Sequence, residues 1–233
     1  MKRGDLKHHT GPYRFYAPVY DRIFAPSFSE GHRNMYRLLN LSKGDRILEV
    51  GVGTGVSLRY CPDYIQLEGI DYSDSMLKQA RQKLDKGKIG RNVTLSKMDA
   101  HDIEFDDHTF DHSLVAHSLA VVAKPEVVLS EMKRVTKRGG RICIVNHYSK
   151  KGALLLNLWN PFRKILGLGE KVNFLELVEN CGLEILEERR VNRDSASIIV
   201  CRVPLNPEPS NGQRGLRGQG LSRPRVQARK KIQ

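Results

Sequence analysis

The stretch from Ile47 to Gly55, which reads Ile-Leu-Glu-Val-Gly-Val-Gly-Thr-Gly, constrains the fold of this chain more than any other. Three of its first four residues are apolar, which predicts a short buried strand. Three glycines at alternate positions then break the strand. Glycine adopts a positive φ without steric cost, so the backbone can turn sharply and approach a ligand closely. The turn has neither the Walker A pattern nor a strict dinucleotide-binding fingerprint, and a tight strand–helix corner without a ligand is the alternative.

An acidic residue follows at the distance that nucleotide-binding proteins use to hold a ribose. Residues 65–70 predict a second strand, and Asp71 closes it. In nucleotide-binding βαβ units a carboxylate roughly 20 residues after the glycines binds the ribose hydroxyls. Together the two motifs resemble those of the class I S-adenosylmethionine (SAM) methyltransferases. The pattern E/D-x-G-x-G-x-G of that family is matched by Glu49, Gly51, Gly53 and Gly55.

This resemblance implies an α/β, Rossmann-like fold in which a seven-stranded, mostly parallel sheet is flanked by helices, with a helical lid at the N-terminal side. It also implies SAM as cofactor and S-adenosylhomocysteine as product. Helices are expected from about Asp74 and at residues 29–41, 126–136 and 173–180. The expected strands lie at residues 47–50, 65–70, 93–95, 110–116, 141–145, 182–190 and 195–203.

By the same resemblance, the cofactor site extends from the glycine turn to the ends of three further strands. Asp99 follows the third expected strand, where the family holds the adenine amino group with an acidic side chain; an ordinary loop aspartate is the alternative. His117 follows the fourth strand, and in open α/β sheets ligands bind at the carboxyl ends of the strands. The predicted cofactor-binding residues are Glu49, Gly51, Gly53, Gly55, Asp71, Tyr72, Asp99, Ala100 and His117.

Two apolar segments flank this core. Residues 13–41 are expected to form the helical lid, because Tyr16, Tyr20 and Phe24 share one helical face. Residues 149–170 form an apolar flap that contains Trp159 and is flanked by cations. Apolar bulk with a tryptophan and adjacent cations is typical of a chain that lies in a bilayer interface. For both segments the alternative is a helix packed on the core.

The chain is basic, with a formal net charge of +13, and this favours an anionic partner such as a membrane surface or a nucleic acid. Residues 1–12 are expected to be flexible, residues 13–204 to form the methyltransferase domain, and residues 205–233 to be a disordered basic tail. No apolar run reaches the length of a membrane-spanning helix. The four cysteines are scattered, which fits a reduced, cytoplasmic protein.

The acceptor of the methyl group is harder to predict than the cofactor. An adenine methyltransferase acting on DNA or RNA is expected to carry [DN]-P-P-[YFW] after the fourth strand, where this chain has Ala-His-Ser-Leu at residues 116–119. No nucleic-acid partner is therefore expected. Residues 20–28, 49–55 and 145–148 instead resemble the soluble bacterial phosphatidylethanolamine N-methyltransferases. That resemblance implies a phospholipid substrate and an anionic membrane surface as partner, with the protein, expected to be a monomer, peripheral to the inner face of the membrane.

The implied reaction needs alignment of the acceptor and exclusion of water more than it needs covalent chemistry by the protein. The headgroup amine must lose a proton before it can attack. The polar groups predicted to accept that proton or to shape the pocket are His147, Tyr148, Tyr20, Tyr16 and His117, with plain packing as the alternative for each. No metal is predicted, because no ligand cluster has suitable spacing. A quinone or other small apolar acceptor remains an alternative, as does a non-enzymatic binder of nucleic acid or membrane.

Overall fold

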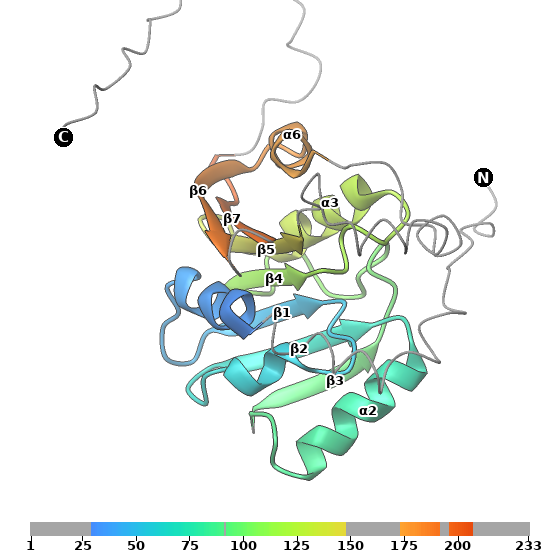
Figure 1. Cartoon of the computed structure of the whole chain (residues 1–233). Coiled ribbons are helices and arrows are strands. Elements are labelled where there is room, and N and C mark those ends of the chain that lie inside the picture. Colours follow the sequence, from blue (N-terminus) through green and yellow to red (C-terminus); the bar gives the residue numbers. More distant parts are fainter. Residues whose placement is uncertain (1–28, 91, 148–172, 192–195, 207–233) are drawn as a thin grey trace, which may run out of the picture.

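A computed structural model describes residues 29–90, 92–147, 173–191 and 196–206. They form a seven-stranded sheet in the order β3-β2-β1-β4-β5-β7-β6 (Figure 1). The first five strands in the sequence pair in parallel, and β7 is antiparallel to both β5 and β6. The strands are β1 (Arg46–Val50), β2 (Gln66–Asp71), β3 (Val93–Lys97), β4 (His112–Ala116), β5 (Arg141–His147), β6 (Glu184–Val191) and β7 (Ala196–Arg202). This sheet confirms the predicted Rossmann-like fold.

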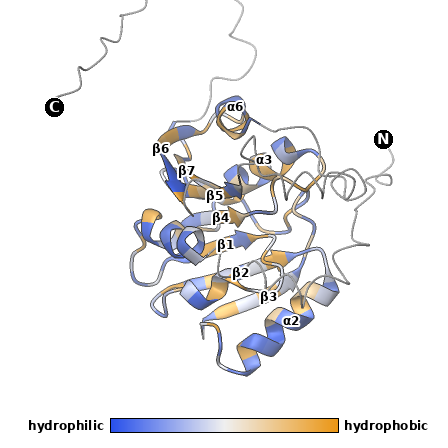
Figure 2. Ribbon diagram, in the orientation of Figure 1, coloured by the Kyte–Doolittle hydropathy of each residue, from blue (hydrophilic) through white to orange (hydrophobic). Residues whose placement is uncertain are grey.

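Helices cover both faces of the sheet, and a separate apolar cluster lies on each face. One cluster joins the helix at residues 29–38, the 3-10 helix η1 (Ser57–Tyr60) and α2 (Asp74–Asp85) to the sheet. The other joins α3 (Pro125–Val135) and α6 (Phe174–Asn180) to the opposite face. A parallel sheet covered on both sides explains why the central strands read as nearly continuous apolar runs. Figure 2 shows the contrast with α2, along which apolar and polar residues alternate.

Strand β1 shows how the sequence assigns residues to the two faces. Ile47 belongs to the cluster under the helix at residues 29–38, whereas Leu48 and Val50 belong to the cluster under α3. Successive side chains of a strand point to opposite faces, so Glu49 points to the same face as Ile47. The motif therefore aims its one acidic side chain toward the N-terminal helix.

The described part of the predicted lid is built into the core. The helix at residues 29–38 buries Met35 and Tyr36, and Leu39 directly after it is also fully buried. The helix is shorter than the predicted residues 29–41 because Asn40 adopts a φ of +57°, a left-handed conformation that ends helices. The rest of the lid, the apolar flap and the tail from residue 207 lie outside the described residues.

Other boundaries differ from the prediction by one to three residues. Strand β5 continues through His147, two residues beyond the predicted range, because β7 pairs with it up to that position. Within the described part of the chain, no helix has the length and apolarity to cross a membrane.

Candidate active site

The carboxyl ends of the five parallel strands meet at one edge of the sheet, and most of the predicted cofactor residues lie there. The glycine turn follows β1, Asp71 ends β2, and Asp99 follows β3. His117 follows β4, and His147 ends β5. Strand carboxyl ends form the ligand-binding edge of open α/β sheets. The fold thus gathers residues that are up to 98 positions apart in the sequence, from Glu49 to His147.

Two glycines of the turn are required for different reasons. Gly51 has a φ of +70°, and a Cβ atom placed on it would lie 2.3 Å from Ser118 Oγ, so the turn packs tightly against the end of β4. Gly53 has a φ of +55°, and no atom of the described residues lies within 4 Å of the position its Cβ would take. Gly51 therefore serves packing, whereas Gly53 leaves open space beside the backbone that a ligand can approach.

Asp71 connects the glycine turn to the turn that begins α2. Its Oδ2 accepts a hydrogen bond from the backbone N–H of Gly53 at 2.8 Å, and its Oδ1 accepts one from Ser73 N–H at 2.8 Å. Burial raises the pKa of this carboxyl, and the two backbone donors oppose that rise. Each carboxylate oxygen has a second lone pair, so the fixed side chain retains acceptors for a pair of hydroxyls. The neighbouring Tyr72 is 43% exposed.

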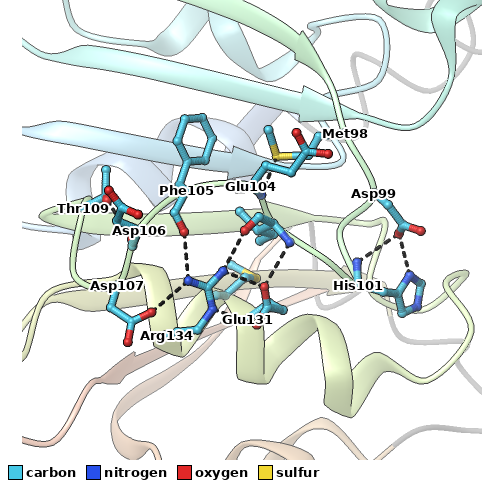
Figure 3. Close-up of polar contacts among 12 residues, drawn as sticks. Met98, Asp99, His101, Glu104, Phe105, Asp106, Asp107, Thr109, Glu131 and Arg134 are labelled. Carbon is cyan, nitrogen blue, oxygen red and sulfur yellow. Dashed lines mark hydrogen bonds and ion pairs between the residues drawn. The ribbon is translucent and has the colours of Figure 1, made fainter. Parts of the chain in front are cut away.

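Asp99 is held by a neighbour in its own loop. Its Oδ1 accepts a hydrogen bond from the backbone N–H of His101 at 2.9 Å and lies 2.8 Å from His101 Nδ1 (Figure 3). The other ring nitrogen of His101 contacts the carbonyl of Ala123. His101 therefore fixes the aspartate between β3 and the segment that leads into α3. Ala100, between them, is half-buried.

A single arginine on α3 anchors the rest of that loop (Figure 3). Arg134 Nη1 donates to the carbonyl of Phe105 at 2.8 Å, and Nη2 donates to that of Ile103 at 2.7 Å. The same guanidinium forms ion pairs with Glu131 and Asp107. Arg134 also lowers the pKa of Glu131 by hydrogen bonding to it. An arginine has donors in a planar fork, and here they tie the loop that carries Asp99 to the helix beneath it.

Glu49, the acidic residue of the glycine motif, lies near the end of β1. Its side chain is buried, at 1% exposure; Oε2 accepts a hydrogen bond from Tyr36 at 3.0 Å, and Oε1 accepts one from Ser57 Oγ at 2.5 Å. These two hydrogen bonds fix the side chain of Glu49 within the core. It joins the N-terminal helix to η1, directly behind the glycine turn. Burial raises the pKa of this carboxyl to about 7.

This buried carboxyl makes stability depend on pH. The folded pKa of Glu49 lies above the ordinary value of 4.5, so the folded state binds the proton more tightly than the unfolded chain. The free energy of unfolding therefore falls as pH rises from about 4.5 to about 7. We expect Glu49→Gln to remove this term and to stabilise the protein at pH 8 by roughly 1–3 kcal/mol, measured by urea unfolding.

A control for this prediction is Glu184→Gln, which alters only an exposed ion pair with Arg202. Surface pairs contribute little, so its unfolding free energy should stay within about 1 kcal/mol of the wild type at every pH. A difference between wild type and Glu49→Gln that does not grow between pH 4.5 and 7 would contradict the buried, proton-binding state of Glu49.

A second histidine, which the sequence did not single out, lies against His117. His117 has a φ of +61°, and its backbone N–H donates to the carbonyl of Val145 at 2.8 Å. Its ring makes an edge contact with the ring of His32, with centroids 5.3 Å apart. His32 is 4% exposed and also lies 6.5 Å from the ring of Tyr60. His32 is one helical turn before Tyr36, so the two residues share one face of the helix. The contact with His117 depends on how this helix packs on the sheet, and no local sequence signal indicates it.

The other predicted catalytic residues are only partly located. His147 closes β5 at the carboxyl edge, whereas the side-chain position of His147 and the whole of Tyr16, Tyr20 and Tyr148 lie outside the described residues. In the described part of the chain, no group of three His, Cys, Asp or Glu residues has the geometry of a metal site. The located groups form a ligand-binding edge with an open glycine turn and two fixed carboxylates. These features fit an adenosyl group, whose ribose and adenine need acceptors.

Comparison with known proteins agrees with this geometry. Residues 48–144 match the family profile described as a methyltransferase domain. Over 137 residues the chain is 39% identical to a phosphatidylethanolamine N-methyltransferase of Cereibacter sphaeroides, which covers 58% of this chain and 67% of that protein. It is 37% identical over 123 residues to a ubiquinone/menaquinone biosynthesis C-methyltransferase of Teredinibacter turnerae, covering 51% of this chain and 49% of that protein. The chain thus spans about half the length of that quinone methyltransferase.

Solved structures share the same fold at low sequence identity. A SAM-dependent methyltransferase from Aquifex aeolicus superposes with a TM-score of 0.66 at 19% identity, covering 82% of this chain and 98% of that one. The phosphoethanolamine N-methyltransferase 2 of Haemonchus contortus, in complex with SAM, also gives 0.66, at 17% identity and with 82% and 57% covered.

Proposed function

This chain belongs to the class I SAM-dependent methyltransferases, and on that premise we propose that it methylates the amine of phosphatidylethanolamine at a membrane surface. The mono- and dimethyl forms are further acceptors, so that the end product is phosphatidylcholine. The observation that carries this proposal is the 39% identity to a phosphatidylethanolamine N-methyltransferase over two thirds of that protein. The basic character of the chain, with a net charge of +13, supports association with an anionic surface.

The residues at the carboxyl edge would hold SAM in the following way. The open backbone at Gly53 would let the cofactor approach. Asp71 would accept hydrogen bonds from the ribose hydroxyls, and Asp99 would accept one from the adenine amino group. When bound, SAM would supply a methyl carbon on a positively charged sulfur. The amine lone pair would form the N–C bond while the C–S electron pair stays on sulfur, which gives S-adenosylhomocysteine. The amine proton would leave to solvent or to a base. The protein's part is to align the amine and to exclude water.

The acceptor would lie over the ends of β4 and β5, beside the paired rings of His32 and His117. Aromatic faces stabilise a methylated ammonium by roughly 0.5–2 kcal/mol each, which supports Tyr60 as part of this region. Arg33 lies with its guanidinium 5.7 Å from the centre of the Tyr60 ring and is a candidate partner for the lipid phosphate. His117 and His147 are the candidate bases for the amine proton, because His117 directly follows β4 and His147 ends β5, and both strands end at this edge.

A second candidate function is C-methylation of a quinone or another small apolar acceptor. The 37% identity to a ubiquinone/menaquinone biosynthesis C-methyltransferase favours it. The two functions differ in how the acceptor arrives. A phospholipid enzyme must dock on a bilayer through apolar surface and cations, whereas an enzyme for a small acceptor needs only an apolar pocket.

A substitution at Trp159 distinguishes these two functions. Trp159 belongs to the predicted apolar flap, which lies outside the described residues. We expect Trp159→Glu to weaken binding to vesicles of phosphatidylethanolamine and phosphatidylglycerol by at least about tenfold, because a charge replaces an interfacial anchor. Release of S-adenosylhomocysteine with these vesicles should fall in parallel, while SAM affinity stays unchanged. Trp159→Phe, which keeps the apolar bulk, is the control. Vesicle binding and turnover equal to wild type in Trp159→Glu would count against the phospholipid function.

A further inference from the structure

An amide on β5 is buried in a way that the cofactor site does not explain. Asn146 is 3% exposed, and both Oδ1 and Nδ2 lack a hydrogen-bonding partner among the described residues. Buried side-chain amides are nearly always hydrogen-bonded, because an unpaired donor or acceptor loses its water without compensation. An amide that remains unpaired at the edge of a binding site suggests a partner that arrives with a ligand.

The pairing of the strands puts Asn146 at the carboxyl edge. It lies opposite Ser197 of β7, and on its other side the backbone of His117 donates to Val145, the preceding residue. Ile142 and Ile144 point to the same face of β5 and belong to the apolar core. Only the last of these three same-face positions is polar. The change from isoleucine to asparagine thus occurs where the strand enters the ligand-binding edge.

The glycine turn reaches the same place. Ser118, the residue after His117, donates a hydrogen bond from Oγ to the carbonyl of Val50 at 3.2 Å and packs against Gly51. One short path of contacts therefore runs from the glycine turn through residues 117–118 to the end of β5. The backbone of β5 at Asn146 is thus linked to the glycine turn, and its side chain leaves the strand on the face that α3 and α6 cover.

We propose that Asn146 binds the acceptor nitrogen, and that Asn146 Oδ1 accepts a hydrogen bond from an N–H group of that nitrogen. This inference rests on the proposed function. The nitrogen must point its lone pair at the methyl carbon, so only its remaining N–H groups are available to the amide. A primary amine has two of them, a monomethyl amine one, and a dimethyl amine none. Asn146 therefore orients the acceptor in the first two methyl transfers and has no N–H to bind in the third.

An amide suits this task better than a carboxylate. A carboxylate at the same position would stabilise the protonated ammonium, which has no lone pair and cannot attack. The neutral amide accepts a hydrogen bond from the N–H group without favouring protonation of the amine. It leaves removal of the proton to other groups at the edge, such as the imidazole of His117.

The test compares Asn146→Leu with wild type on three vesicle-borne acceptors: phosphatidylethanolamine, its monomethyl form and its dimethyl form. Leucine has nearly the same volume but no hydrogen-bonding atoms. We expect kcat/KM to fall about tenfold for the first two acceptors and to stay unchanged for the dimethyl form. The melting temperature should be equal or higher, because an unpaired buried amide has been removed. Asn92→Leu is the control. The amide of Asn92 donates to the backbone carbonyl of Asp63 at the amino-terminal end of the sheet, so this substitution should leave kcat/KM unchanged for all three acceptors.

The pattern across acceptors distinguishes binding from a structural role. An equal fall for all three acceptors would mean that the substitution disturbs the site generally, and no fall would mean that Asn146 does not contact the amine; either result overturns the inference. The proposed function is judged separately, from the wild-type rates. A wild type that methylates none of the three lipids refutes the proposed function, and the inference is refuted with it.

Discussion

A Gly53→Val variant is expected to fold and to lose about 1000-fold in SAM affinity, or roughly 4 kcal/mol of binding free energy. The physical reason is the open space beside this residue, in which the Cβ atom would meet no described atom of the protein. The valine side chain would occupy the space through which the cofactor approaches the backbone. Isothermal titration with SAM and S-adenosylhomocysteine measures the loss, and circular dichroism measures the fold.

Gly44→Val is the matched control, because it separates backbone strain from loss of the site. Gly44 also has a positive φ, +90°, and also has no described atom within 4 Å of its Cβ position, but it precedes β1 at the opposite end of the strand. Both variants should lose roughly 1–3 kcal/mol of stability from the strained valine. Only Gly53→Val should lose SAM affinity. Equal SAM affinity in the two variants would show that the cofactor does not lie against Gly53.

Replacing Asp71 with alanine is expected to reduce SAM affinity by a similar factor, about 1000-fold. The side chain acts in two ways: its carboxylate would accept the ribose hydroxyls, and it fixes the glycine turn through Gly53 N–H. Hydrogen bonds to a charged group contribute about 1.5–3 kcal/mol each, so two lost bonds account for about 4 kcal/mol. Titration of the variant with SAM measures this directly.

Asp74→Ala provides the control three residues away. Asp74 forms a surface ion pair with Lys97, with 69% of its side chain exposed, and such pairs contribute little to stability. Its SAM affinity should remain within a factor of about two of wild type. If Asp71→Ala retained SAM affinity as well as Asp74→Ala does, the ribose could not be held by this carboxylate.

Much of the cofactor edge could be predicted from the sequence, because short-range patterns determine it. The apolar run before Gly51 must be a buried strand, and an acidic residue that closes the next strand must reach the same edge, since parallel strands align their carboxyl ends. The structure gives that arrangement, with Asp71 ending β2 and bonded to Gly53. The local sequence pattern and the overall topology agree here, so a single sequence is sufficient to predict where Asp71 and the glycine turn lie.

Contacts between distant segments could not be predicted in the same way. Glu49 belongs to the motif, but its partners Tyr36 and Ser57 come from two other elements, and only the packing of the N-terminal helix on the sheet brings them together. The pairing of His32 with His117 depends on that same packing. Asn146 lies just beyond the predicted strand, in the stretch at residues 145–148 that carries the family resemblance. The sequence does not show that its amide lacks a partner, because that is a property of the folded molecule.

The N-terminal helix therefore contacts both halves of the site. Through Tyr36 it contacts Glu49, directly before the glycine turn, and through His32 it contacts His117, beside which we propose that the acceptor lies. In its described part, residues 29–41, the predicted lid packs on the core of the domain. The same helix leads back in sequence to the aromatic residues of the predicted lid.

The most direct test of the central claim, that this methyltransferase acts on a phospholipid amine, offers both acceptors at once. Purified protein is incubated with methyl-labelled SAM and vesicles that contain phosphatidylethanolamine and a demethylated quinone in equal amounts, and the labelled products are separated. We predict label on the lipid amine, as mono-, di- and trimethylated phosphatidylethanolamine. Label on the quinone carbon, with none on the lipid, would contradict the claim.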